Sequence, residues 1–112
     1  MQVQDVAPDV GVTGQVRPED MKALAASGFR SLICNRPDDE EPGQPAWADV
    51  AAAAQAEGME VRHIPVGADI PLESQVPAFA DALREMPRPI LAFCRTGNRS
   101  GMLYRAAEDT AG

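Results

Sequence analysis

The chain has 112 residues, of which 45% are hydrophobic and 24% are charged, which is typical of one folded domain and excludes a disordered chain. Its net charge of −7 disfavours binding to nucleic acid, and its two cysteines are too few for a disulfide framework. No segment approaches the roughly 20 apolar residues that span a bilayer, and the N-terminus lacks a basic, apolar leader, so we expect a cytoplasmic protein without a membrane partner.

Short apolar segments bounded by turn residues predict four strands, and helical patterns separate the last three of them. In chain order the predicted strands are Gly11–Gly14, Ser31–Asn35, Val61–Val66 and Pro89–Phe93. This alternation predicts an α/β domain over residues 1–112, with a mostly parallel central sheet of about four to five strands flanked by helices.

The first two predicted helices have clear ends. The first has Pro18 in its opening turn and ends at Gly28. The second begins a helical apolar spacing at Trp47 and ends at Gly58. The acidic segment RPDDEEPGQ, residues 36–44, precedes the second helix and predicts an exposed loop.

Two further helices are predicted in the second half of the chain. In the third, Ser74 is the predicted N-cap, because the first turn is the place where a helix tolerates the missing N–H of Pro77. The fourth is expected from about Arg99 to Glu108, directly after the last predicted strand.

The most informative segment is residues 94–100, which joins an apolar strand to a helix. A thiol at the N-terminal end of a helix faces unpaired backbone N–H groups, which lower its pKa, so Cys94 is the predicted nucleophile. Gly97 permits a positive φ in a nest of N–H groups, and Arg99 adds a two-pronged donor for oxyanion oxygens. The residues predicted to bind the oxyanion are Arg95, Thr96, Gly97, Asn98 and Ser100.

Other reactive side chains have simpler interpretations. Cys34 is predicted to pack as a small apolar residue, with a resolving thiol as the alternative, because parallel strands bring both cysteines to one edge of the sheet. His63 is predicted to be structural, and Arg36 either pairs with Asp38 or a neighbouring acid or adds positive charge beside Cys94. We expect no metal and no cofactor.

The motif C-x-x-G-x-R-S at Cys94 resembles the active-site loops of rhodaneses and, one residue longer, of cysteine-dependent phosphatases. With GQVRPEDMKALAASGFRSLICNRPDDEEPGQP, AEGMEVRHIPV and PRPILAFCRTGNRS, nearly the whole chain resembles the phosphatase-like domain of the bacterial beta-lactamase hydrolase-like family. The resemblance implies the dual-specificity-phosphatase fold. Members are described as phosphatases and as sulfur transferases, alone or fused to persulfide-handling or sulfide-oxidising enzymes.

The chain departs from the phosphatase pattern in two places. The loop between Cys94 and Arg99 is one residue shorter, and Phe93 stands where those phosphatases have a histidine. A shorter loop supplies one N–H group fewer and a narrower cradle, which suits a single persulfide sulfur better than a phosphoryl group. We therefore expect a sulfurtransferase that works through a Cys94 persulfide, with a small-molecule or protein sulfur donor and acceptor.

Two alternatives remain at this point. In a phosphomonoesterase acting on a phosphorylated substrate, Cys94 would form a phosphocysteine and Arg99 would hold the phosphoryl oxygens. The resemblance of HIPVGAD to the dual-specificity phosphatases implies Asp69 as the general acid, and the rival acids are Asp38, Glu40 and Glu41. The third reading is an inactive module that binds an oxyanion.

Overall fold

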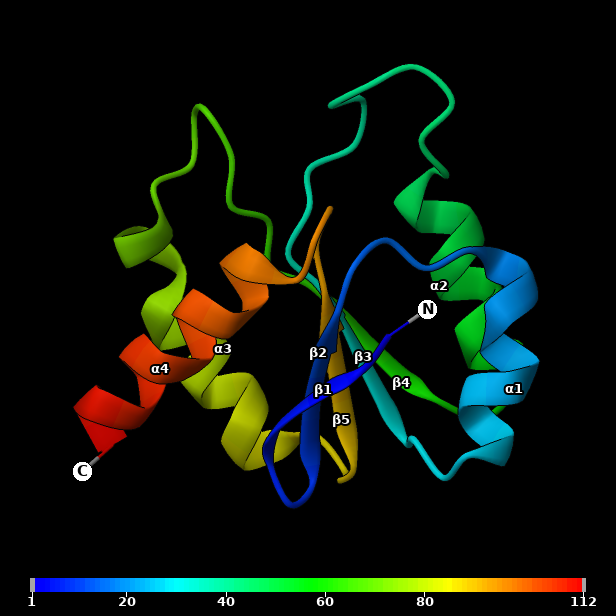
Figure 1. Cartoon of the computed structure of the whole chain (residues 1–112), viewed down its shortest axis with the longest axis horizontal. Helices are drawn as coiled ribbons and strands as arrows, with labels where there is room; N and C mark the ends of the chain where they lie inside the picture. The colour runs from blue at the N-terminus through cyan, green and yellow to red at the C-terminus, as the bar shows by residue number, and fades with distance from the viewer. Residues whose placement is uncertain (1, 112) are drawn as a thin grey trace.

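The computed structural model describes residues 2–111, in which five strands form one mixed sheet with helices on both faces (Figure 1). The elements are β1 (Gln4–Ala7), β2 (Val10–Thr13), the 3-10 helix η1 (Pro18–Asp20), α1 (Met21–Ala26), β3 (Ser31–Cys34), α2 (Trp47–Ala56), β4 (Glu60–His63), α3 (Leu72–Glu85), β5 (Ile90–Phe93) and α4 (Asn98–Ala111). The strand order is β1-β2-β5-β3-β4, and only the β1 and β2 pair is antiparallel. The α/β architecture with a mostly parallel sheet is confirmed.

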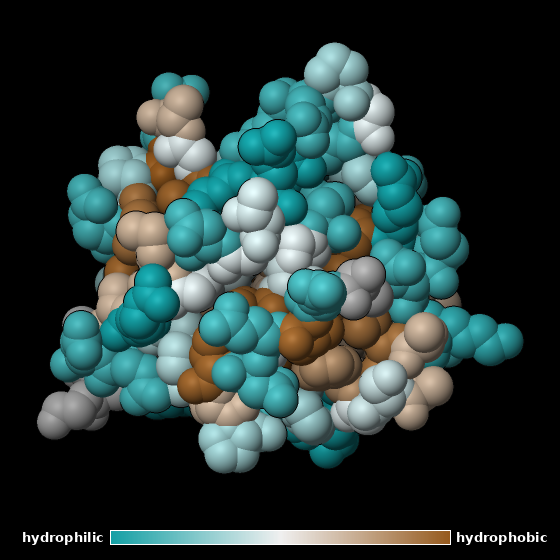
Figure 2. Space-filling view, in the orientation of Figure 1, coloured by the Kyte–Doolittle hydropathy of each residue, from teal (hydrophilic) through white to brown (hydrophobic). Residues whose placement is uncertain are grey.

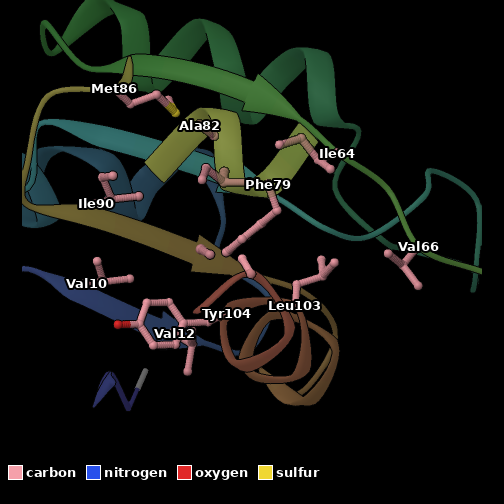
Figure 3. Packing of buried hydrophobic residues seen from close by; sticks show 13 residues of the cluster. Val10, Val12, Ile64, Val66, Phe79, Ala82, Met86, Ile90, Leu103 and Tyr104 are labelled. Atoms are coloured by element: carbon pink, nitrogen blue, oxygen red, sulfur yellow. The ribbon is translucent and has the colours of Figure 1, made fainter. Parts of the chain in front are cut away.

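The sheet separates two apolar layers, because neighbouring residues of a strand point to opposite faces. On the face covered by α3 and α4, the buried cluster includes Ile33, Ile90, Ala92, Phe79 and Leu103 (Figure 3). On the face covered by α1 and α2, it includes Leu32, Cys34, Leu91, Phe93 and Val50. In the described part of the chain, no helix has the length and apolar character needed to cross a membrane.

Two features differ from the sequence-based prediction. Strand β1 was not predicted, because its four residues include polar side chains that are exposed at the sheet edge. The prediction of Ser74 as N-cap was wrong: α3 begins at Leu72, and the Ser74 hydroxyl donates a hydrogen bond to the Pro71 carbonyl at 2.6 Å. Pro77 therefore lies beyond the first turn, where it leaves the carbonyl of the exposed Glu73 without its helical partner.

The carboxyl ends of the parallel strands lie at one edge of the sheet, and ligands of parallel α/β sheets gather at such an edge. The loops that leave β3, β4 and β5 meet there, and Figure 1 shows the first two as long projections on either side of the start of α4. Residues 14–17, which follow β2, lie against the third loop, because Gln15 N–H donates to the Arg95 carbonyl at 3.2 Å.

Candidate active site

Cys94 is the first residue after β5, and it lies at the floor of the loop that opens α4. Its backbone N–H donates to the Thr13 carbonyl at 3.3 Å, which ties the loop to the neighbouring strand β2. The residue has no exposed surface in this conformation. A substrate therefore reaches the sulfur only when the side chains above it shift.

The surroundings of Cys94 favour its thiolate. Burial on its own would raise the pKa, but hydrogen bonds from the N–H groups of Ser100, Thr96 and Gly97 and from the Ser100 hydroxyl outweigh that cost, so the pKa of Cys94 is lowered. The Gly97 N–H lies 3.1 Å from Sγ. The first turn of α4 and the loop before it thus activate the sulfur with backbone donors.

Ser100 links this loop to strand β3. Its hydroxyl lies 2.8 Å from Oδ1 of Asn35, which is buried and whose side-chain amide donates to the Ile64 carbonyl at 2.9 Å. A hydroxyl has one proton to give, so Asn35 and the Cys94 thiolate compete for it. Asn35 was not among the predicted site residues, although its place directly after a central parallel strand is a signal that could have identified it.

Arg99 is fixed above the loop by two acceptors. Its Nη1 donates to the Val66 carbonyl at 2.7 Å and to Glu40 Oε2 at 2.8 Å, and its Nη2 donates to Glu40 Oε1 at 2.9 Å. The pKa of Arg99 is raised, chiefly by the hydrogen bond to Glu40 and to a smaller extent by the nearby Cys94 thiolate. The guanidinium is thus held by Glu40 and the Val66 carbonyl close to Cys94, where its positive charge can bind an anion.

Glu40 joins Arg99 to a second, buried arginine. Arg36 has 2% exposed surface, and it donates to Glu40 Oε1 at 2.9 Å, to Glu41 Oε1 at 2.9 Å and to the Gln15 side-chain oxygen at 2.9 Å. The hydrogen bond from Arg99, with that from Arg36, holds the pKa of Glu40 below its usual range despite partial burial. Arg36 pairs with Glu40 and Glu41 rather than with Asp38.

The remaining acids near the site differ in their surroundings. Asp38 accepts the Trp47 backbone N–H at 2.8 Å and so serves the start of α2. Glu41 pairs with Arg36 and lies 3.7 Å from Arg95. Asp69 is exposed on the turn after β4 and shares a cavity of about 400 Å³ with Glu40. The role of Asp69 as general acid stays a prediction.

Cys34 and His63 both contact the backbone carbonyl of Arg36. The Cys34 thiol donates to the Arg36 carbonyl at 3.2 Å, and burial raises the pKa of Cys34 to about 12. His63 Nε2 lies 3.0 Å from that same carbonyl, and its ring stacks on Trp47 at 5.4 Å between ring centroids. Both side chains therefore support the turn that carries Arg36. Among residues 2–111, no group of His, Cys, Asp and Glu side chains is arranged to hold a metal ion.

The structure thus brings most of the predicted site residues together. Cys94, Thr96, Gly97, Arg99 and Ser100 surround one point at the N-terminal end of α4. The side chains of Arg95 and Asn98 are exposed, so their contribution to the loop comes from the backbone: the Arg95 carbonyl accepts from Gln15, and the Asn98 N–H donates to the Thr96 hydroxyl at 3.3 Å.

We expect iodoacetamide to alkylate Cys94 and not Cys34 near neutral pH. The lowered pKa of Cys94 makes its thiolate available at a lower pH than that of an ordinary thiol, while the raised pKa of Cys34 keeps it protonated. Residue-level mass spectrometry over a pH series measures both rates in the same sample. Faster labelling of Cys34 would contradict this assignment.

We expect Gly97→Val to lose at least about tenfold in activity while the fold persists. Gly97 has φ +95, and a Cβ there would approach the Thr13 backbone carbonyl carbon and oxygen at 3.3 Å, so the loop must change shape and move its N–H groups away from the sulfur. The control is Gly101→Ala, since a Cβ at Gly101 meets nothing within 4 Å. Circular dichroism with the activity assay separates the two effects, and full activity in Gly97→Val would refute the proposed loop geometry.

Comparison with known protein families gives one match over almost the entire chain. The model of the beta-lactamase hydrolase-like protein, phosphatase-like domain, matches residues 2–111. A beta-lactamase hydrolase-like protein of Agrobacterium fabrum is 39% identical over 97 residues, which are 87% of this chain and 22% of that protein. The chain therefore spans about a quarter of the length of such relatives.

Solved structures share the fold. A candidate phosphatase from Neisseria meningitidis superimposes with a TM-score of 0.83 at 30% identity, covering 93% of this chain and 74% of that one. A second, from Shewanella putrefaciens, has a TM-score of 0.84 at 22% identity and covers 98% and 69% of the two chains. The architecture is that of the dual-specificity-like cysteine phosphatases.

Proposed function

Because this chain belongs to the phosphatase-like domain family of the beta-lactamase hydrolase-like proteins, we propose that it acts through a nucleophilic Cys94, and that its reaction is sulfur transfer through a Cys94 persulfide. The observation that carries the proposal is the pairing of the acids around Cys94. Glu40 and Glu41 are bound by arginines, and Asp38 caps a helix, so none of the three is placed to donate a proton.

The pairing of these three acids leaves Asp69 as the acid that hydrolysis of a phosphate ester would need, whereas transfer of a sulfane sulfur needs none. An alkoxide leaves poorly unless an acid protonates it, whereas sulfite and thiolates leave as stable anions. The loop of four residues between Cys94 and Arg99 also fits this chemistry, since its N–H groups stabilise an anionic sulfur at Cys94 and a shorter loop offers a narrower cradle than that of the phosphatases. Sulfur transfer therefore needs the Cys94 thiolate and the anion-binding groups of the loop, and no general acid.

With thiosulfate as donor, the Cys94 thiolate attacks the outer sulfur. A sulfur–sulfur bond forms at Cys94, the bond between the outer sulfur and the sulfonate breaks, and its electron pair leaves with sulfite. The persulfide anion is then held by the same N–H groups and by Arg99. Attack of cyanide on the outer sulfur releases thiocyanate and restores the thiolate, so charge and atoms balance without a proton.

Phosphomonoester hydrolysis is the second candidate, and the family description and the candidate phosphatases among its relatives favour it. In that reaction Cys94 would form a phosphocysteine and Asp69 would protonate the leaving oxygen. Asp69 is exposed and faces the cavity it shares with Glu40, so it would have to approach Arg99 when substrate binds.

The test compares wild type and Asp69→Asn in two assays, thiosulfate with cyanide and an alkyl phosphate. Sulfur transfer needs no acid, so we expect thiocyanate formation by Asp69→Asn to stay within about threefold of wild type, with little phosphate released by either protein. Efficient alkyl phosphate hydrolysis by wild type that falls roughly 10²- to 10⁴-fold in Asp69→Asn would replace this proposal with the phosphatase.

A further inference from the structure

A groove lined by arginines extends sideways from the Cys94 loop. One hollow of about 370 Å³ is lined by Arg36, Glu40, Glu41, Arg95 and Arg99. A second, of about 440 Å³, shares Arg36, Glu41 and Arg95 and continues to Arg17. Because the two hollows share three residues, they form one groove that starts beside Arg99 and runs between the residues 36–46 loop on one side and residues 15–17 and 95–96 on the other.

The groove has the opposite charge to the rest of the molecule. It contains four of the ten basic residues of a chain whose net charge is −7, whereas its lining includes two glutamates. The residues 36–46 loop, which borders the groove, forms a mostly hydrophilic projection at this edge of the molecule (Figure 2). A local excess of positive charge on an acidic protein attracts anions to this place.

The groove already binds carboxylates of its own loop. Glu40 Oε1 accepts from Arg36 and from Arg99, both at 2.9 Å, so the guanidinium above the sulfur and the buried guanidinium are bridged by one oxygen. Glu41 is half exposed, bonds Arg36 at 2.9 Å and lies 3.7 Å from Arg95, whose side chain is 62% exposed. The outer part of the groove is thus a position for a carboxylate, and the half-exposed Glu41 side chain occupies it in this structure.

We propose that this outer part of the groove is a second binding site, which takes a carboxylate carried by the sulfur donor. The inference rests on the proposed sulfur transfer: the donor's outer sulfur lies at Cys94, and a short carbon chain places its carboxylate between Arg95 and Arg17. There it replaces the Glu41 carboxylate beside Arg36, because Glu41 is half exposed and a donor carboxylate carries the same negative charge. The preferred donor is therefore an anionic organic persulfide rather than an uncharged one.

The transfer step is the same for both kinds of donor. The Cys94 thiolate attacks the outer sulfur of R–S–SH, the internal sulfur–sulfur bond breaks, and the electron pair leaves with the R–S sulfur. The proton of the transferred sulfur passes to that thiolate, giving R–SH and the Cys94 persulfide anion. Donors that differ in R alone therefore report on the groove and not on the chemistry.

The experiment compares the hydropersulfides of 3-mercaptopropionate and 2-mercaptoethanol, generated in place, in wild type and in the double variant Arg17→Ala/Arg95→Ala. We expect wild type to prefer the carboxylate donor about tenfold in kcat/KM, with the preference falling as salt is raised, and the double variant to lose that preference. The matched control is Arg30→Ala, an exposed arginine directly before β3, at the opposite edge of the sheet, which should keep it.

Binding measured without turnover separates this inference from the proposed function. Amide resonances of the groove are followed by NMR while succinate or uncharged succinamide is added, and succinate is expected to shift them with a Kd that the double variant weakens about tenfold. Equal turnover of both persulfides by wild type, or equal shifts with both probes, would overturn the groove site. Succinate binding without turnover of either persulfide would keep the groove and reject sulfur transfer.

Discussion

Cys94→Ser is expected to lower turnover roughly 10⁴-fold or more, whichever of the two reactions the protein catalyses. The N–H groups of Thr96, Gly97 and Ser100 stabilise a thiolate, and a serine hydroxyl, whose pKa is far higher, stays protonated in the same position. Replacing sulfur with oxygen removes the nucleophile while the loop keeps its shape. Steady-state thiocyanate formation measures the loss.

The control for this variant is Cys34→Ala. Cys34 is buried, its pKa is raised to about 12, and its thiol bonds the Arg36 carbonyl, so a direct part in the reaction is not expected. We expect Cys34→Ala to keep activity within about threefold of wild type, with a stability cost typical of a small buried truncation. A loss as large as that of Cys94→Ser would assign Cys34 the role of a second reactive thiol.

Arg36→Ala is expected to lower the free energy of unfolding by about 2–3 kcal/mol. The buried guanidinium bonds Glu40, Glu41 and Gln15. Its loss opens a cavity beneath the site and removes a donor from each of these acceptors, of which Glu40 keeps its bonds from Arg99. The two glutamates are partly exposed, at 27% and 47%, so water satisfies them in part and the cost lies at or below the lower end of the range for a broken buried ion pair. Urea denaturation followed by the fluorescence of Trp47 measures it.

Arg36→Lys is the matched variant, and we expect it to lose about half as much free energy of unfolding, because an ammonium keeps the charge but cannot span three acceptors.

The lowered pKa of Glu40 makes the free energy of unfolding depend on pH. Its ion pairs stabilise the fold above the ordinary pKa of a glutamate, and that contribution disappears as the pH falls through the lowered value. Arg99 is the larger cause of the lowered pKa and is present in both proteins, so only the part due to Arg36 should make the difference between wild type and Arg36→Ala shrink in acid. A loss below about 1 kcal/mol at neutral pH would show that Arg36 does not hold the loop.

The sequence predicted the sheet and the Cys94 loop because both depend on local patterns. Apolar segments between turn residues indicated β3, β4 and β5, and the order of strand, Gly97, Arg99 and helix placed Cys94 at the start of α4. Such features follow from neighbours along the chain. The short β1 has no such pattern, since its pairing with β2 and not its composition makes it a strand.

The partners of Arg99 could not be predicted in the same way. Glu40 lies on a loop that is distant from Arg99 in sequence. The acidic segment contains several carboxylates, and the sequence does not indicate which of them pairs with Arg99. Which of them reaches Arg99 depends on the path of residues 36–46 beyond the edge of the sheet, and the contacts of Arg36 and of Asp38 with the start of α2 fix that path. Asn35 was missed for a related reason, because its contact with Ser100 joins the end of β3 to the first turn of α4, which are distant in sequence.

The most direct test of the proposed chemistry is the intact mass of the protein after incubation with thiosulfate in the absence of an acceptor. We expect wild type to gain about 32 Da, the mass of one sulfur atom, and to lose it when cyanide is added. Cys94→Ser should gain nothing. An unchanged mass in wild type, together with a phosphorylated Cys94 trapped from an aryl phosphate, would contradict the persulfide and establish the phosphatase.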